Sequence, residues 1–316
     1  MITAYVKNAA GKRFQLPALR AWDLRYTLGN PCDAFEVRFL YDAETMESLL
    51  LQAVSFQLVQ DGVTVFTGFI DEACACADTD GLTVTLSGRG PAARLIDNEA
   101  PPAVYYNASL DFILDRHVRP FGLSPVRIPS CPGLSKFTVS TGVSQWSVLR
   151  DFLSLTIGKS PRFSPVGELL LDDPDGKSLA VDNTVAVSSA LRRITRHGVL
   201  SSVLVQCKST GAALTVQNDG FLALGGCASR VLSVPRSASY ADMLGKGQQQ
   251  IDRAKEELEV CTLTLPQPFA AFPADIIRLR HSPVVPDGSY RVSAARCRAG
   301  RDGITTQLTL IPKEVS

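Results

Sequence analysis

The sequence predicts a mainly β fold with an α+β insert, in which two related β-domains flank a small α/β middle domain. One observation is a repeat: a strand, a turn closed by Asp-Gly and a second strand occur at residues 68–88 and again at residues 290–310. Alternating strands around Asp-Gly are a strong hairpin signal, because glycine accepts the positive φ of a tight turn. The other observation is helical periodicity between the two hairpins. The two β-regions therefore enclose a unit of a different kind.

The two hairpins correspond part by part. The first consists of Gly68–Cys76, the turn Asp80-Gly81 and Leu82–Leu86, and the second of Tyr290–Arg298, the turn Asp302-Gly303 and Ile304–Leu310. We therefore expect residues 1–96 and 187–316 to share a fold.

Composition places the chain among ordinary globular proteins. Its 316 residues correspond to about two or three domains, and a hydrophobic fraction of 45% provides a core. Lys and Arg total 32 against 31 Asp and Glu, so no net field attracts nucleic acid or an anionic membrane. Nucleic-acid specificity and membrane insertion are not expected.

The N-terminus lacks the features of a signal peptide, and no apolar run approaches the roughly 18 residues that span a bilayer. We expect the chain to fold in a cytosol. No pair of cysteines has Cys-x-x-Cys spacing, so neither a zinc ribbon nor a disulfide scaffold is predicted. The cysteines are expected to be mostly small buried hydrophobes; they stand at positions 32, 74, 76, 131, 207, 227, 261 and 297.

Residues 1–96 are predicted to form the first β-domain. Its expected strands are short alternating or β-branched runs at 21–28, 34–41, 54–60 and 63–69. Asp61-Gly62 is a further hairpin turn. Residues 43–52 resemble one short helix between strands. Close-spaced strands with one helix indicate a small barrel or sandwich.

Residues 97–186 are predicted to form the middle α/β domain. Pro91 stands near the start of a helix that leads out of the first domain, and Pro101-Pro102 separates the two domains. Amphipathic helices are expected at 109–119, capped by Ser109, and at 144–157, ended by Gly158. A small hairpin is expected to pair 162–163 with 168–171.

Residues 187–316 are predicted to form the second β-domain. Its expected strands lie at 199–208, 213–217, 220–224, 260–265, 276–280, 289–298 and 304–311. A long helix is expected at 239–259. The order of strands, helix and strands matches the first domain, so this helix is interpreted as the longer equivalent of residues 43–52.

Three groups of residues imitate binding sites. Gly158-Lys159-Ser160 resembles the end of a phosphate-binding loop, but Leu153 stands where that loop needs glycine, and a helix C-cap is the better interpretation. Cys74 and Cys76 share one face of a strand with no histidine near them in sequence, so a metal site is not expected. The histidines belong to no nucleophile or metal motif, and structural or surface roles are predicted for His117, His197 and His281.

Charged clusters are the remaining candidates. Glu168, Asp172, Asp173 and Asp175 could be imagined as a glycosidase pair, but Asp-Asp-Pro-Asp-Gly is better explained by turn chemistry. A basic run fits two interpretations equally: an interface for an acidic partner, or a solvated strand edge that arginine protects from aggregation. That run comprises Arg192, Arg193, Arg196 and His197. We predict no catalytic, cofactor-binding or metal residue.

Three passages together resemble the baseplate hub proteins of contractile phage tails and phage-tail-like particles. They are Ser87–Asp97; Gln145–Leu153 with Gly167–Leu171 and Pro174; and Phe272–Leu279 with Ser289–Val292. Their order spans nearly the whole chain, and it is the order rather than any single motif that is specific.

The resemblance implies two tube-like β-barrel domains per chain, so that three chains present six barrels in a ring. Such a homotrimer would join a six-fold tail tube, or its initiator protein, to a three-fold spike within the baseplate of a virion or phage-tail-like particle assembled in the bacterial cytoplasm. Related secretion-system proteins fuse hub and spike. Because this sequence ends at Ser316 after the second barrel, we expect the spike, like the other baseplate proteins, to be a separate chain.

Two other classes remain alternatives. A tail-associated cell-wall-degrading component would need converging carboxylates or a His/Cys site, which the sequence has only in scattered form. A carbohydrate-binding module would need exposed aromatic platforms, whereas Trp22 and Trp146 lie in apolar-patterned segments. Neither class explains the duplication, so we expect a structural protein without enzymatic activity.

Overall fold

The structure, a computed structural model, describes residues 2–28, 30–41, 51–79, 81–207, 210–234, 240–256 and 258–313. It is mainly β, as predicted. One sheet of 13 strands runs through both ends of the sequence, and three small sheets accompany it.

The first β-region contains every strand that the sequence predicted there, together with two strands near the N-terminus that it did not. The strands are β1 (Ile2–Asn8), β2 (Arg13–Gln15), β3 (Leu19–Thr27), β4 (Ala34–Leu40), β5 (Ala53–Gln60), β6 (Val63–Asp78) and β7 (Gly81–Arg89). β6 joins two runs that were predicted separately. Gly81 has a φ of 97°, as the hairpin turn requires. Asp80 and most of the helix predicted at 43–52 lie outside the described residues.

The second β-region repeats the strand order of the first. Its strands are β12 (Ser178–Val181), β13 (Ser189–Ile194), β17 (Glu259–Leu265), β18 (Ile276–Leu279), β19 (Gly288–Gly300) and β20 (Gly303–Pro312). The first region pairs in the order β3-β4-β7-β6-β5-β1, and the second in the order β13-β17-β20-β19, with β18 and then β12 on the far side of β19. Within these two orders of six strands, each strand has the same neighbours as its counterpart. One pairing differs in direction, because β1 runs antiparallel to β5 whereas β12 runs parallel to β18.

The two long hairpins match residue by residue. Phe69 faces Arg89 in the first as Arg291 faces Ile311 in the second. Each long strand also carries a bulge at the same place, between Ile70 and Glu72 in β6 and between Val292 and Ala294 in β19. A shared bulge increases local twist at one defined point. The duplication seen in the sequence is therefore a duplication of strand geometry.

The predicted equivalence of the two helices is wrong. The long helix α6 (Tyr240–Glu256) lies between β13 and β17, which correspond to β3 and β4. The segment 43–52 lies one strand later, between β4 and β5. Helical periodicity reports which residues form a helix but not between which paired strands the helix is inserted.

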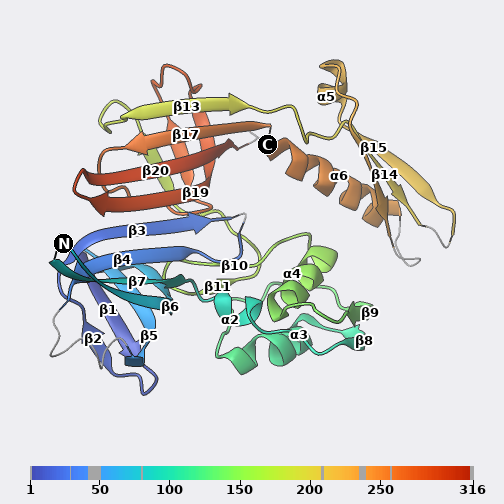
Figure 1. Cartoon of the computed structure of the whole chain (residues 1–316). Helices are drawn as coiled ribbons and strands as arrows, with labels where there is room; N and C mark the ends of the chain where they lie inside the picture. The colour runs from blue at the N-terminus through green and yellow to red at the C-terminus, as the bar shows by residue number, and fades with distance from the viewer. Residues whose placement is uncertain are drawn as a thin grey trace.

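The two β-regions are joined edge to edge. β3 pairs antiparallel with β19, from Trp22 opposite Ala299 to Thr27 opposite Ala294. Figure 1 shows β13, β17, β20, β19, β3 and β4 following one another across the molecule. Buried residues of both regions form one hydrophobic cluster, which includes Phe39 and Leu308. Among the described residues the pairing order runs from β13 to β2 without closing on itself.

The middle region packs around its own core. Its elements are α2 (Ala93–Ile96), β8 (Ala103–Ala108), α3 (Leu110–His117), the short 3-10 helix η1 (Arg119–Phe121), β9 (Leu134–Val139), α4 (Gln145–Thr156), β10 (Arg162–Phe163) and β11 (Leu169–Leu170). The Ser109 side chain accepts a hydrogen bond from the Phe112 amide, as predicted for an N-cap. Gly158 follows the last turn of α4 with a φ of 68°, which confirms the helix end.

A third group of elements projects from the second β-region (Figure 1). It contains β14 (Ser202–Gln206), β15 (Ala213–Gln217), α5 (Asp219–Ala223), β16 (Ser229–Ser233) and α6. They bury a small separate cluster that includes Val203 and Ile251. The strand predicted at 220–224 is wrong, because the Asn218 side chain accepts the Phe221 amide and starts the helix α5 there. The domain limits at 96 and 186 stay predictions.

Candidate functional site: charged joints and open sheet edges

The residues that imitate a phosphate loop or a metal site do not assemble into one. Lys159 and Ser160 line a cavity of about 1070 Å³ between α4, α6 and the second β-region. That lining mixes cations such as Lys246 with the anions Asp252 and Glu256, so it does not select one ligand charge. Cys74 and Cys76 are exposed on β6. In the described part of the chain, no three His, Cys, Asp or Glu side chains are grouped so as to hold a metal ion.

His117 is a buried structural residue of the middle region, as predicted. Its Nδ1 lies 2.6 Å from Oε1 of Gln145 at the start of α4, and its Nε2 lies 3.1 Å from the hydroxyl of Tyr105 on β8. Burial lowers the pKa of His117, so the ring is neutral near pH 7. The ring therefore ties α3 to α4 and β8. His197 and His281 are exposed.

The passage around Gly88 and Arg89 is a joint between the first β-region and the middle region. The Arg89 guanidinium donates to Asp71 on β6, with Nε to Oδ2 at 2.7 Å, and to Asp97 after α2, with Nη2 to Oδ2 at 2.7 Å. The hydrogen bonds from Arg89 lower the pKa of Asp97. Leu95, between the two charged residues, is fully buried in the middle core. The passage Ser87–Asp97, which resembles the hub family, therefore has a structural role. Its arginine ties the bulged strand β6 to the start of the middle region.

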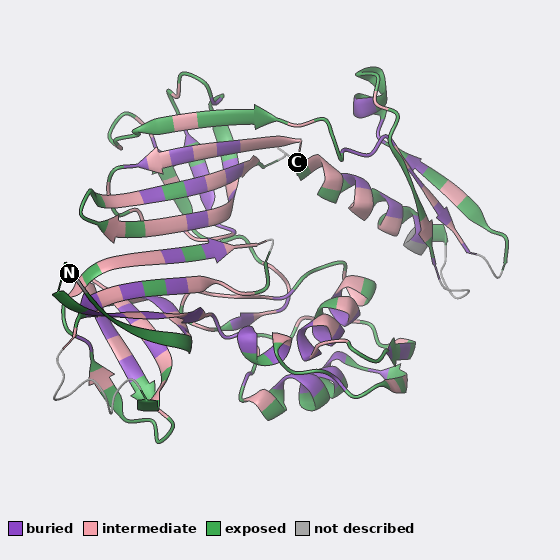
Figure 2. Ribbon diagram, viewed as in Figure 1, coloured by how far each residue is buried: buried purple, intermediate pink, exposed green. Residues whose placement is uncertain are grey.

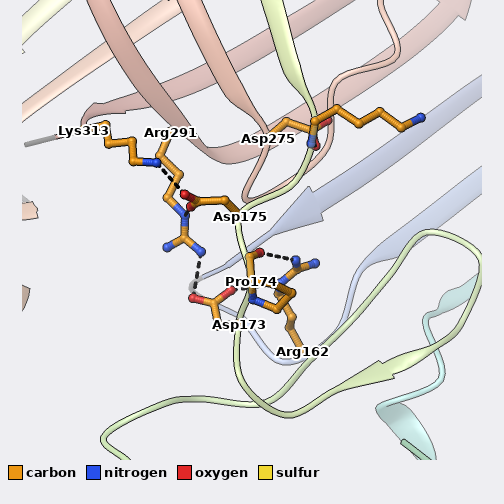
Figure 3. Close-up of polar contacts among 8 residues, drawn as sticks. Arg162, Asp173, Pro174, Asp175, Asp275, Arg291 and Lys313 are labelled. Carbon is orange, nitrogen blue, oxygen red and sulfur yellow. Dashed lines mark hydrogen bonds and ion pairs between the residues drawn. The ribbon is translucent and has the colours of Figure 1, made fainter. Parts of the chain in front are cut away.

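Two of the carboxylates considered for catalysis, Asp173 and Asp175, form a second joint (Figure 3). Asp173 accepts from Arg162 on β10 at 2.9 Å and from Arg291 on β19 at 2.8 Å. Asp175 is paired with Lys313, whose hydrogen bond lowers the pKa of the Asp175 carboxyl. Five charged side chains from four segments therefore fix the link between the middle region and the second β-region.

Buried Asp275 holds the same link from the other side. One of its carboxylate oxygens accepts the Lys177 amide at 2.7 Å, and the other accepts the Phe272 amide at 2.9 Å. Asp172 is paired with Arg127, and Glu168 is within hydrogen-bond distance of the Ser164 hydroxyl. The sequence interpretation of this cluster as turn chemistry was incomplete, because Arg127, Arg291 and Lys313, which bind its aspartates, stand far away in sequence.

Arg192 and Arg193 of the basic run lie on an open edge of the large sheet, and Arg196 and His197 follow that strand. β13 pairs with β17, and no other strand of the described chain pairs with it. Arg192 is bound to Glu259 of β17, with Nε to Oε1 at 2.8 Å. Leu191 and Ile194 are exposed by 48% and 57%, although they are apolar. Figure 2 shows β13 exposed along most of its length.

A second open edge lies on β6. Val63–Phe69 of this strand pair with β5, but beyond the bulge β6 pairs only with β7 within the described residues. Every residue from Asp71 to Ala77 is exposed. Within the described residues, β13 and the stretch of β6 beyond the bulge are therefore two unpaired strand edges, one in each β-region.

Comparison with known proteins places this architecture. A tail protein from Neisseria meningitidis superposes with a TM-score of 0.78 over 99% of this chain and 97% of its own length, at 18% sequence identity. A tail protein of the prophage MuSo2 from Shewanella oneidensis superposes with a TM-score of 0.80 over 99% and 98%, at 15% identity. The chain has the fold of phage tail proteins. The predicted resemblance is confirmed at this level.

A third similar structure extends the fold to secretion systems. An E. coli protein, described as a component of the type VI secretion system with structural similarity to tail proteins of bacteriophage T4, matches with a TM-score of 0.62 at 13% identity. The match covers 94% of this chain and 74% of that one. No family model and no curated protein matches the sequence. None of the described helices is long and apolar enough to cross a membrane.

Proposed function

We propose that this chain is the baseplate hub of a contractile tail or tail-like injection device. In this role it is a homotrimer that adapts a six-fold tail tube, or its initiator protein, to a separate three-fold spike among the other baseplate proteins. Its place is the tail baseplate of a virion or of a phage-tail-like particle, assembled in the bacterial cytoplasm.

The observation that carries this proposal is the repeated strand order. Each chain holds two units in which six strands pair in the same order, with matched hairpins and matched bulges, and the units are joined edge to edge through β3 and β19. Two equivalent units per subunit allow a three-fold object to offer six equivalent surfaces. A tube with six subunits per layer needs such a surface, whereas a carbohydrate-binding module or a hydrolase does not.

We also propose that the chain is not an enzyme. The carboxylates that a glycosidase would use are taken up by structural pairs: Asp173 binds two arginines and Asp175 binds Lys313. Both acids of a glycosidase must instead face one sugar ring. Peptidoglycan turnover by the purified chain is expected at background. Specific hydrolysis that disappears in Glu168→Gln or Asp172→Asn would overturn this view.

The hub role is tested by mass and shape. Light scattering of the purified chain, alone and mixed with its candidate spike, is expected to give three chains per particle. Electron microscopy of the same sample is expected to show a ring with a central channel that caps the tail tube at one end. A chain that stays monomeric in both samples, and that does not bind the tube, contradicts the proposal.

A further inference from the structure

The contact between β3 and β19 is a template for a contact between chains. β13 is the counterpart of β3, and β6 is the counterpart of β19. The equivalent contact therefore brings β13 against β6. In the described part of one chain these strands do not pair, and β17, β20, β19, β3, β4 and β7 lie between them in the sheet. Both edges are left open.

The open stretch of β6 is the counterpart of the stretch that β3 covers on β19. β19 uses Gly288–Arg291 to pair with β18 and, beyond its bulge, Ala294–Ala299 to pair with β3. β6 likewise uses the part before its bulge for β5. The segment left over, Glu72–Ala77, is exposed. A long open edge is a ready template for another chain, and proteins that do not use such an edge usually protect it.

β13 carries an exposed apolar side chain at a position where its counterpart β3 is covered. Tyr26 on β3 is 3% exposed, because the ring of Phe272 from the second β-region packs against it with centroids 5.2 Å apart. Its counterpart on β13 is Ile194, exposed by 57%. Ile276 of β18 pairs with Arg291 as Ser55 of β5 pairs with Phe69, so Phe272, four residues before Ile276, corresponds to Leu51. Leu51 is exposed by 83%. Both members of the equivalent pair are thus apolar and uncovered.

We propose that copies of this chain join head to tail by antiparallel pairing of β13 with β6 of the next copy, in the register that β3 and β19 use within the chain. Phe35 of β4 and Cys261 of β17 are counterparts, and they face Leu24 and Arg192, which aligns β3 with β13. When the register of β3 and β19 is applied to β13 and β6, Cys74 of one copy lies opposite Arg193 of its neighbour. Cys76 then stands opposite Leu191.

Charge supports this register. Within the chain, Arg296 of β19 reaches diagonally to Asp23 of β3, with Nη2 to Oδ2 at 2.5 Å. In the proposed contact Glu72 of β6 lies diagonal to Arg193 of β13, within reach of two long side chains. The junction within the chain and the junction between copies therefore each have one diagonal ion pair. The acid lies on β3 in the first junction and on β6 in the second. This reversal disfavours β13 pairing with β19, because Arg296 would face Arg193, the counterpart of Arg25, with Leu191 in place of the acid Asp23.

The pairing is heterologous, because each copy contributes one β13 and one β6. Such contacts close into a ring when the rotation between neighbours allows it, and otherwise form filaments. The expected closure at three copies rests on the proposed function. The strand register does not, so the experiment below separates the two.

Disulfide trapping tests the register with cysteines that the chain already holds. In an antiparallel ladder, opposite residues have Cα atoms about 4.5 or 5.5 Å apart, which is within the range that a disulfide spans. Arg193→Cys is expected to form a disulfide with native Cys74 of the neighbour under mild oxidation. Leu191→Cys with native Cys76 is an independent second variant. Arg192→Cys is the matched control, since its side chain leaves the opposite face of the strand.

The expected result is a covalent ladder on a denaturing gel that ends at three chains. Arg193→Cys and Leu191→Cys should give at least tenfold more product than Arg192→Cys, and Cys74→Ser should abolish the product of Arg193→Cys alone. Equal cross-linking by all three variants, in a sample that light scattering shows to be trimeric, would overturn the register and leave the hub role standing. Covalent species larger than three chains would overturn closure. A monomer without cross-links would overturn both proposals.

Discussion

Replacing Gly88 with alanine should test how tightly the first long hairpin is built. A Cβ at position 88 would lie 1.9 Å from the carbonyl oxygen of Phe69 and 2.8 Å from the ring of Phe35. Ordinary contact begins near 3.4 Å, so the strands would have to separate by about 1 Å or more. The carbonyl belongs to the backbone of paired β6, which cannot move aside without loss of ladder hydrogen bonds. We expect Gly88→Ala to lower the free energy of unfolding by about 3 kcal/mol or more.

The matched control is Gly90→Ala, two residues along the chain, where the nearest atom to a new Cβ is the Asp33 amide nitrogen at 3.5 Å. Urea unfolding followed by circular dichroism should shift its midpoint by about 1 M or more in Gly88→Ala and hardly at all in Gly90→Ala. The counterpart of Gly88 in the second hairpin is Leu310, so the shared strand order accepts a side chain at this position. The local geometry around Gly88 is what excludes one. Equal midpoints for the two variants would refute the close approach.

Three further predictions concern charged groups. Arg89→Met removes both carboxylate contacts of the first joint and should lower the free energy of unfolding by about 1 kcal/mol, since these pairs are partly exposed. The control Arg150→Met loses only a contact to its sequence neighbour and should have no measurable effect. Parallel urea titrations compare the two variants. Burial raises the pKa of Asp33 from its ordinary 3.8 to about 7, so the folded state keeps a proton that the unfolded state releases, and stability falls as pH rises through this window. Asp33→Asn should therefore have a higher melting temperature than the native protein at pH 8 and the same melting temperature at pH 4. An increase of the same size at both pH values would refute this. Burial lowers the pKa of His117 below 6.5, so the unfolded state takes up a proton first and stability is lost as pH falls below about 6.5. His117→Gln should flatten the melting temperature between pH 7 and pH 5, and an unchanged slope would show that the loss arises elsewhere.

Local signals in this sequence specify local structure. The Asp-Gly turn at 302–303, the cap at Ser109 and the periodicity of 144–157 correspond to elements that form from near neighbours. The strand at Ser189–Ile194 was missed because its pattern is that of an exposed edge, with little alternation. The strand predicted at 220–224 failed because an asparagine cap, which acts over three residues, outweighed a short apolar run.

The sequence by itself determined the fold class, the duplication and the resemblance to tail hubs, because these depend on patterns that repeat within short windows. Only the tertiary structure decided how the two copies meet and where the charges go. Asp173 pairs with Arg162 and Arg291, and Asp23 pairs with Arg296. The periodicity of a helix or strand relates residues only a few positions apart, so it does not predict these pairs. The same holds for the two open edges: whether a strand edge is free depends on which strands pair, and pairing is a property of the folded sheet.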